Sequence, residues 1–96
     1  MNMQNLKLII FNSLLGNVNK KVRSLAYDYY HNKIIIYGYL DAEPDDDDYE
    51  AIDIAISEIM SSCPNLEYQE INLVKSCDPI GTLNPYKGWV FVRREN

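Results

Sequence analysis

Two β-rich runs on either side of a short polar turn constrain the fold of this chain more than any other feature. In residues 22–30, apolar or aromatic side chains alternate with smaller or polar ones, which is the period of a half-buried strand. Residues 34–40 (Ile-Ile-Ile-Tyr-Gly-Tyr-Leu) are dense in β-branched and aromatic side chains. Asparagine tolerates a positive φ, so either His31-Asn32 or Asn32-Lys33 predicts a tight turn. Together these residues predict a β-hairpin.

A helix is expected after the hairpin, and its first residues are strongly acidic. Seven of the ten residues from Asp41 to Glu50 are Asp or Glu. Pro44 suits the first turn of a helix, where its missing N–H costs nothing. Beyond it, apolar residues recur on one helical face, at Ile52, Ala55, Ile56, Ile59 and Cys63. Because Pro64 disfavours a longer helix, the pattern predicts a helix over residues 44–62.

The rest of the chain predicts one more helix and two more strands. Residues 3–15 repeat apolar side chains at spacings of three and four and end before a Gly-Asn pair, which is typical of a helix. Residues 67–74 alternate as a half-buried strand does. Residues 78–86 contain two prolines and a glycine and predict a loop, and residues 89–92 form a short apolar, β-prone run.

These elements predict a single domain over residues 1–96, with the order α-β-β-α-β-β. We expect a two-layer α+β fold with two helices on one face of a four-stranded, mostly antiparallel sheet. The long helix between the second and third strands makes those two strands run in the same direction. The strand order stays open: the sheet is mixed if these two strands are neighbours, and antiparallel throughout if the third lies beside the first.

The charge of the chain excludes several classes of partner. Nine Lys and Arg against fourteen Asp and Glu give a net charge of −5, and the sequence pI is about 4.6. Binding of nucleic acid requires Lys and Arg to neutralise phosphates, and binding to an anionic membrane surface requires the same. The charge therefore predicts no nucleic-acid or membrane partner and favours a basic protein or a metal cation.

The cysteines and the start of the chain bear on its compartment. No basic segment precedes an apolar stretch near Met1, so the sequence predicts a cytoplasmic protein without a secretory signal. Thiols stay reduced in the cytoplasm, so we expect Cys63 and Cys77 to be small core-filling residues, with a disulfide as the alternative.

No arrangement of residues predicts catalysis, so the chain is not expected to be an enzyme. The one histidine, His31, lies in the predicted hairpin turn without a nearby Cys or Ser that it could activate. The four glycines are isolated, so no phosphate-binding loop is predicted. Zinc-site spacing is also absent, and we expect no cofactor and no metal.

The acidic run is open to three interpretations. Carboxylates in a first helical turn complement the helix dipole, by about 0.3–1 kcal/mol each, so the run is in part an ordinary solvated helix start. Counted from Asp41 as a calcium loop, position six is Asp46 rather than Gly and position twelve is Ile52 rather than Glu, which fails the EF-hand pattern. Because four consecutive aspartates exceed what a helix cap needs, the third interpretation is a docking surface for a basic partner.

Tyrosine is the second compositional signal, with eight residues against two Phe and one Trp. If Ile34, Ile36 and Leu40 face the helices, Tyr37 and Tyr39 lie on the open face of the sheet. Tyrosines there favour a protein interface, because they combine a large rigid contact area with a polar tip. They are equally consistent with cross-strand aromatic pairs that simply cover the sheet.

Several segments together resemble a known family. They are the hairpin end Tyr39-Leu40-Asp41, the acidic start of an amphipathic helix, its Cys63-Pro64 end, and the late segments Asp78-Pro79-Ile80 and Lys87 to Glu95. In their order and their C-terminal signature, these segments resemble immunity proteins of bacterial contact-dependent growth inhibition systems. The resemblance covers residues 14–95.

The resemblance implies a cytoplasmic protein that binds the C-terminal toxin domain delivered by a neighbouring cell, commonly a nuclease, and blocks its active site. An acidic inhibitor suits a basic substrate cleft, and we expect one copy of the chain to bind one toxin domain. The alternative is an acidic adaptor that docks a basic host protein. Charge and placement alone, and not the family, indicate the candidate toxin-binding residues Asp45, Asp46, Asp47, Asp48, Glu50, Tyr37 and Tyr39.

Overall fold

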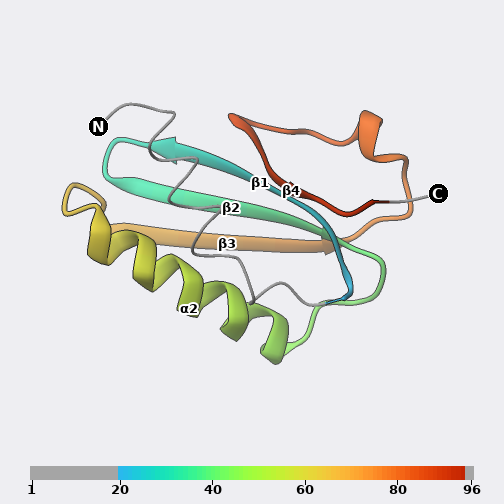
Figure 1. The fold of residues 1–96 in the computed structure, drawn as a ribbon, viewed down its shortest axis with the longest axis horizontal. Helices are drawn as coiled ribbons and strands as arrows, with labels where there is room; N and C mark the ends of the chain where they lie inside the picture. The colour runs from blue at the N-terminus through green and yellow to red at the C-terminus, as the bar shows by residue number, and fades with distance from the viewer. Residues whose placement is uncertain (1–19, 95–96) are drawn as a thin grey trace.

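A four-stranded sheet with one α-helix against it makes up residues 20–94, which are the residues that the computed structural model describes (Figure 1). The strand order is β3-β2-β1-β4. The elements along the chain are β1 (Val22–Tyr30), β2 (Lys33–Leu40), α2 (Asp46–Ser62), β3 (Tyr68–Lys75), the short 3₁₀ turn η1 (Ile80–Thr82) and β4 (Gly88–Val92).

The predicted hairpin is confirmed. Strands β1 and β2 pair antiparallel, with Tyr30 opposite Lys33 next to the turn and Val22 opposite Leu40 at the far end. The turn is at His31-Asn32, and the positive φ of 55° falls on His31. Histidine is one of the non-glycine residues enriched in that region of backbone conformation.

The predicted architecture, α-β-β-α-β-β with two helices on one face of the sheet, is wrong. The described residues have the order β-β-α-β-η-β, with α2 as their one α-helix and a mixed sheet. Strand β3 pairs with β2 in parallel, from Lys33 opposite Tyr68 to Leu40 opposite Lys75. The two strands are parallel because α2, which is 17 residues long, returns the chain to the end of the sheet at which β2 starts. The helix predicted for residues 3–15 lies outside the described residues.

The core lies between α2 and one face of the sheet. Alternate residues of β2 point to this face, where Ile34, Ile36 and Leu40 have no exposed surface. They belong to the same buried cluster as Ile56 and Ile59 of α2. Burial of each such side chain stabilises the fold by about 1.5–3 kcal/mol. The other face of β2 carries Tyr37 and Tyr39, as predicted, and both are half-buried.

The two cysteines do not share one environment. Both are free thiols, with Cys63 buried and Cys77 exposed. Burial raises the pKa of the Cys63 thiol, so this cysteine behaves as the small core residue that we predicted. The same prediction is wrong for Cys77, because it lies just after β3, where the chain has left the core.

Candidate functional site

The acidic run begins α2 with a capping box. Asp45 is the N-cap residue, and its side chain accepts a hydrogen bond from the Asp48 N–H at 3.1 Å. The Asp48 carboxylate in turn accepts one from the Asp45 N–H at 2.9 Å. Two of the backbone N–H groups that every helix start leaves unpaired are therefore satisfied within the run itself.

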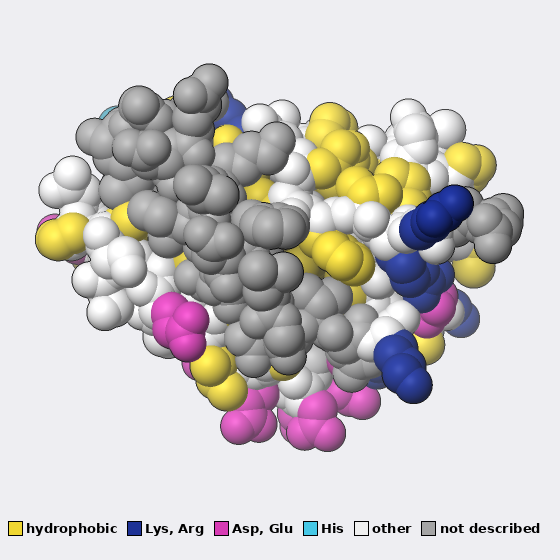
Figure 2. All heavy atoms as spheres, viewed as in Figure 1, with side chains coloured by type: hydrophobic (Ala, Val, Ile, Leu, Met, Phe, Trp, Pro, Cys, Tyr) yellow, Lys and Arg dark blue, Asp and Glu magenta, His cyan; other side chains and the backbone are white. Residues whose placement is uncertain are grey.

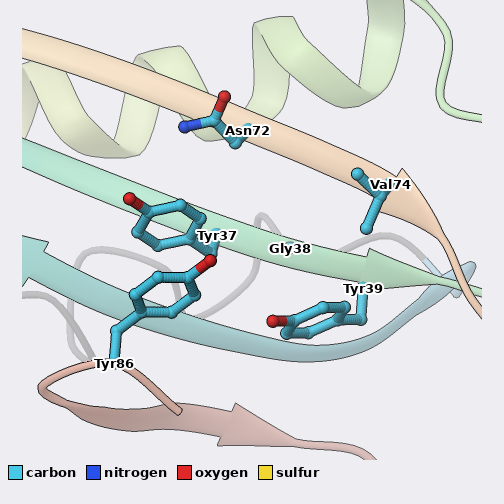
Figure 3. A pocket seen from close by; sticks show the side chains of 6 residues that line it. All are labelled: Tyr37, Gly38, Tyr39, Asn72, Val74 and Tyr86. Atoms are coloured by element: carbon cyan, nitrogen blue, oxygen red, sulfur yellow. The ribbon is translucent and has the colours of Figure 1, made fainter. Parts of the chain in front are cut away.

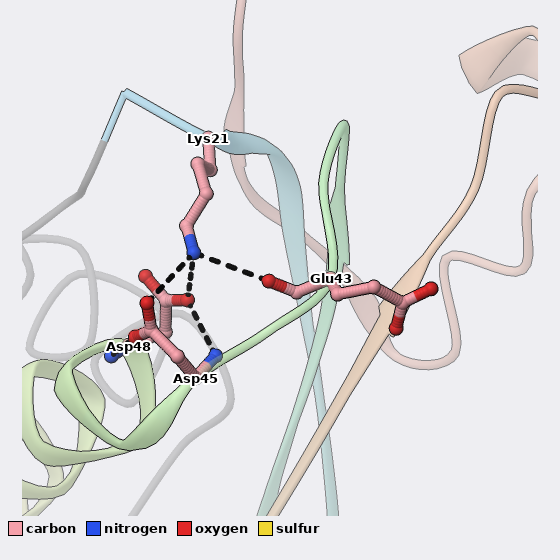
Figure 4. A network of polar contacts seen from close by, with 4 residues as sticks. All are labelled: Lys21, Glu43, Asp45 and Asp48. Atoms are coloured by element: carbon pink, nitrogen blue, oxygen red, sulfur yellow. Dashed lines mark hydrogen bonds and ion pairs between the residues drawn. The ribbon is translucent and has the colours of Figure 1, made fainter.

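Lys21, at the start of the hairpin, holds this cap against the sheet (Figure 4). Its Nζ lies 2.6 Å from Asp48 Oδ2 and 3.2 Å from Asp45 Oδ2, and it also donates to the Glu43 carbonyl oxygen at 3.2 Å. The hydrogen bond to Asp48 is the main cause that raises the pKa of Lys21. The pKa of Asp45 is lowered, mainly by the hydrogen bond from the Asp48 N–H and next by the hydrogen bond from Lys21.

The acidic run therefore divides into two groups. Asp45 and Asp48 bind Lys21, and the Asp48 side chain is only 1% exposed, so a partner cannot reach it. Asp46, Asp47 and Glu50 are exposed and form no ion pair or side-chain hydrogen bond with any residue in the described range 20–94. Figure 2 shows acidic side chains gathered at the lower edge of the molecule, beside the first turns of α2. Of the five predicted acidic site residues, three are thus exposed without an ion pair in the described range, whereas Asp45 is exposed but bound to Lys21.

The predicted tyrosines form part of an aromatic cluster on the open face of the sheet. The rings of Tyr37 and Tyr86 stack with centroids 3.5 Å apart and an interplanar angle of 5° (Figure 3). The Tyr39 hydroxyl donates to the Asn84 carbonyl oxygen at 3.0 Å, and its ring contacts Trp89 edge-on at 5.9 Å. Burial is the main cause that raises the pKa of Tyr37 and of Tyr39, so both hydroxyls stay protonated.

Tyr86 reaches this cluster through a strained backbone. Its φ is +50°, a region that a bulky residue occupies only where its surroundings enforce it. The Tyr86 N–H is bound by Asn84 Oδ1 at 2.8 Å, and the next N–H, of Lys87, donates to the Tyr27 carbonyl of β1 at 2.9 Å. Because the Asn84 carbonyl also accepts from the Tyr39 hydroxyl of β2, the loop is tied to the sheet on both sides of the strained residue. Backbone strain of this kind is often found at binding sites.

A pocket of about 240 Å³ opens beside the stacked rings, lined by Tyr37, Gly38, Tyr39, Asn72, Val74 and Tyr86. Tyr86 and Asn72 were missed as site residues. The Pro and Gly content of residues 78–86 predicted a loop, but it did not predict the direction in which that loop folds. Asn72 lies opposite Tyr37 only because β3 pairs with β2.

The two predicted halves of the site lie in different layers of the molecule. The free carboxylates are on α2, which covers one face of the sheet (Figure 1). Tyr37 and Tyr39 project from the opposite face. The structure therefore does not bring them into one cluster. Their role in binding stays a prediction.

Metal-ligand groups and membrane-spanning helices were searched for among residues 20–94. Within residues 20–94 no three His, Cys, Asp or Glu side chains are grouped so that they could hold a metal ion. No helix in that range has both the length and the apolar character that a bilayer crossing needs. The expectation that no cofactor is used stays a prediction.

The ion pairs predict how the free energy of unfolding depends on pH. Lys33 is the main cause that lowers the pKa of Glu70, and the pKa of Asp45 is lowered as well. A carboxyl group whose pKa is lower in the folded than in the unfolded chain stabilises the fold at pH values above its unfolded pKa. This stabilisation should therefore be lost as the pH falls below about 4. The raised pKa of Lys21 adds stability that should be lost above about pH 10, and burial of Tyr39 disfavours its ionised form in the same range. Urea titrations from pH 3 to 11 should show a plateau between these limits; a steady change across neutral pH would contradict the assignment.

Comparison with known proteins supplies the family. The family model of the MafI2 immunity protein matches residues 3–95. A search of the curated proteins found no match to the chain. The resemblance to immunity proteins is therefore confirmed at the level of a toxin–immunity system, whereas contact-dependent growth inhibition as the particular system stays a prediction.

Proposed function

This chain belongs to the MafI2 immunity protein family, and we propose that it binds a cognate toxin domain and neutralises it by covering the basic active-site cleft of that toxin. The observation that carries the proposal is the family match over residues 3–95. In this proposal the chain acts by binding the toxin in a 1:1 complex in the cytoplasm and does not itself catalyse a reaction. Its toxin is a nuclease domain delivered by a neighbouring cell, as in contact-dependent growth inhibition.

The charges of the described residues support a basic partner. The chain carries a net charge of −5, and the exposed carboxylates of Asp46, Asp47 and Glu50 form no ion pair within residues 20–94. A nuclease cleft is built to hold phosphates, so closely spaced carboxylates can occupy the same positive field. Charge of this kind mainly accelerates encounter and selects the partner, whereas buried contacts hold the complex.

The predicted toxin-binding residues divide accordingly. Asp46, Asp47 and Glu50 are proposed to face the toxin, and Asp45 and Asp48 to hold α2 in the position that presents them. Tyr37 and Tyr39 are proposed to supply aromatic contact area next to the pocket.

Co-expression tests this proposal. Cells that produce the toxin domain encoded beside this chain's gene should stop growing, and production of the chain should restore growth. The same cells with a toxin domain from an unrelated toxin–immunity pair are the control, and they should not be protected. If the folded chain is present and the cells still die, the proposal is wrong. Recovery of a basic host protein with the chain would then favour the adaptor alternative.

A further inference from the structure

Strand β3 is an edge of the sheet, and no strand among residues 20–94 pairs with its outer side. Within β3, the N–H of Tyr68 donates to the Asn32 carbonyl at 3.1 Å, and just beyond it the N–H of Ser76 donates to the Leu40 carbonyl at 2.9 Å. Both bonds point toward β2, and successive residues of a strand bond on alternate sides. The even-numbered residues therefore bond to β2. The residues whose backbone groups point outward are Gln69, Ile71, Leu73 and Lys75.

These outward groups form a long, regular binding edge. None of them has a hydrogen-bond partner among residues 20–94. The strand is eight residues long and contains neither Pro nor Gly. Proteins usually shorten, bulge or cover such an edge, because it can pair with another chain. The opposite edge, β4, is shorter at five residues, and its register with β1 is interrupted. Of these two edges, β3 is therefore better suited to accept a strand.

The β3 edge runs between the two layers that carry the two halves of the candidate site. On the open face of the sheet, Asn72 and Val74 of β3 line the tyrosine pocket. On the other face, α2 runs alongside β3 (Figure 1), and Gln69 donates a hydrogen bond to Asp53 of the helix. Asp46 lies seven residues before Asp53, two turns earlier on the same side of α2. A segment bound along β3 would have carboxylates on one side and the aromatic pocket on the other.

We propose that β3 pairs with an extended segment of the toxin, which adds a strand to the sheet. The inference rests on the proposed function and specifies how the partner is held. Main-chain hydrogen bonds supply the contact, and alternate side chains of the segment point to opposite faces. Those directed toward α2 are basic, to match Asp46 and Asp53. Those on the open face are apolar or aromatic, to match Val74 and the tyrosine pocket.

Amide hydrogen exchange tests this pairing residue by residue. In the free chain the amides of Tyr68, Glu70, Asn72 and Val74 should be protected, whereas those of Gln69, Ile71, Leu73 and Lys75 should exchange more rapidly. The catalytically inactive toxin domain encoded beside this chain's gene is the probe. In its complex the second set should slow by at least about tenfold, so that the alternation disappears. An alternation that persists in the complex would overturn the inference.

Proline at position 69 provides a matched mutational test. Gln69 is exposed, and its N–H points outward, so Gln69→Pro should fold while it removes one donor and obstructs an added strand. Gln69→Ala removes the same side chain, including its bond to Asp53, and keeps the N–H. We expect Gln69→Pro to bind the toxin at least about tenfold more weakly than Gln69→Ala. Urea unfolding of both variants checks that each is folded.

The outcomes separate this inference from the proposed function. If the wild-type chain does not bind the toxin, both are wrong. If it binds, and Gln69→Pro binds as tightly as Gln69→Ala, the edge inference is wrong and the proposed function stands. A free chain that is a dimer, and that Gln69→Pro converts to a monomer, would show that a second copy occupies β3, which also contradicts the inference.

Discussion

Removal of the three free charges at the start of α2, in the variant Asp46→Asn/Asp47→Asn/Glu50→Gln, should slow association with the toxin by about ten- to hundredfold at low ionic strength. The reason is that these carboxylates are exposed and form no ion pair among the described residues. Asp45 and Asp48 are left in place because they cap the helix and bind Lys21. Stopped-flow or surface-binding kinetics at several salt concentrations would measure the change. The dependence on salt should weaken in the variant, since fewer charges are left to screen.

Two acidic residues outside this cluster provide a control. Glu58 and Asp78 are exposed, and neither carboxylate takes part in an ion pair within residues 20–94. A Glu58→Gln/Asp78→Asn variant changes the net charge by +2 but leaves the start of α2 intact. Its association rate should stay within about threefold of the wild type. Equal slowing by both variants would show that net charge, and not the cluster, steers the toxin.

Replacement of Gly38 with valine should lower the free energy of unfolding by about 2–3 kcal/mol, a large share of the total for a domain of this size. Gly38 is buried in the middle of β2. A Cβ atom there would lie 2.5 Å from Cδ2 of Leu73 and 3.1 Å from Cδ2 of Leu25. The glycine is needed for this close packing between neighbouring strands, and its φ is not in the left-handed region. Urea unfolding monitored by circular dichroism would measure the loss.

A second glycine and a double variant make this prediction specific. At Gly81 an added Cβ would meet no atom within 4 Å, so Gly81→Ala should change the stability by less than about 0.5 kcal/mol. In Gly38→Val/Leu73→Ala, the smaller side chain leaves room for valine. The double variant should be more stable than the sum of its single changes predicts, by at least about 1 kcal/mol. Strict additivity would show that the contact with Leu73 is not the cause.

The local elements of the fold could be predicted because neighbouring residues determine them. The alternation in β1 and β2, the turn at His31-Asn32 and the apolar face of α2 all depend on residues close together in the chain. The position of β3 could not be predicted, because the direction imposed by the crossover helix allows β3 to lie beside either strand of the hairpin. Its pairing with β2 places Asn72 and Val74 next to Tyr37 and Tyr39.

The candidate site was predicted in part. The errors in that prediction also come from contacts between residues that are far apart in the sequence. Asp48 looked like one of four equivalent aspartates, but Lys21, which is far from it in sequence, lies 2.6 Å from its carboxylate, and its side chain is almost fully buried. Tyr86 reaches Tyr37 through a positive φ that a tyrosine rarely adopts. Neither contact leaves a periodic signal in the sequence, so only the three-dimensional structure reveals them.

The most direct test of the central claim is a titration of the purified toxin domain with the purified chain, monitored through the activity of the toxin. Neutralisation by binding predicts that activity falls linearly and reaches zero at one chain per toxin, when the toxin concentration exceeds the Kd. Light scattering of the mixture should then give the mass of one chain plus one toxin domain. Full toxin activity at a tenfold molar excess of folded chain would contradict the claim.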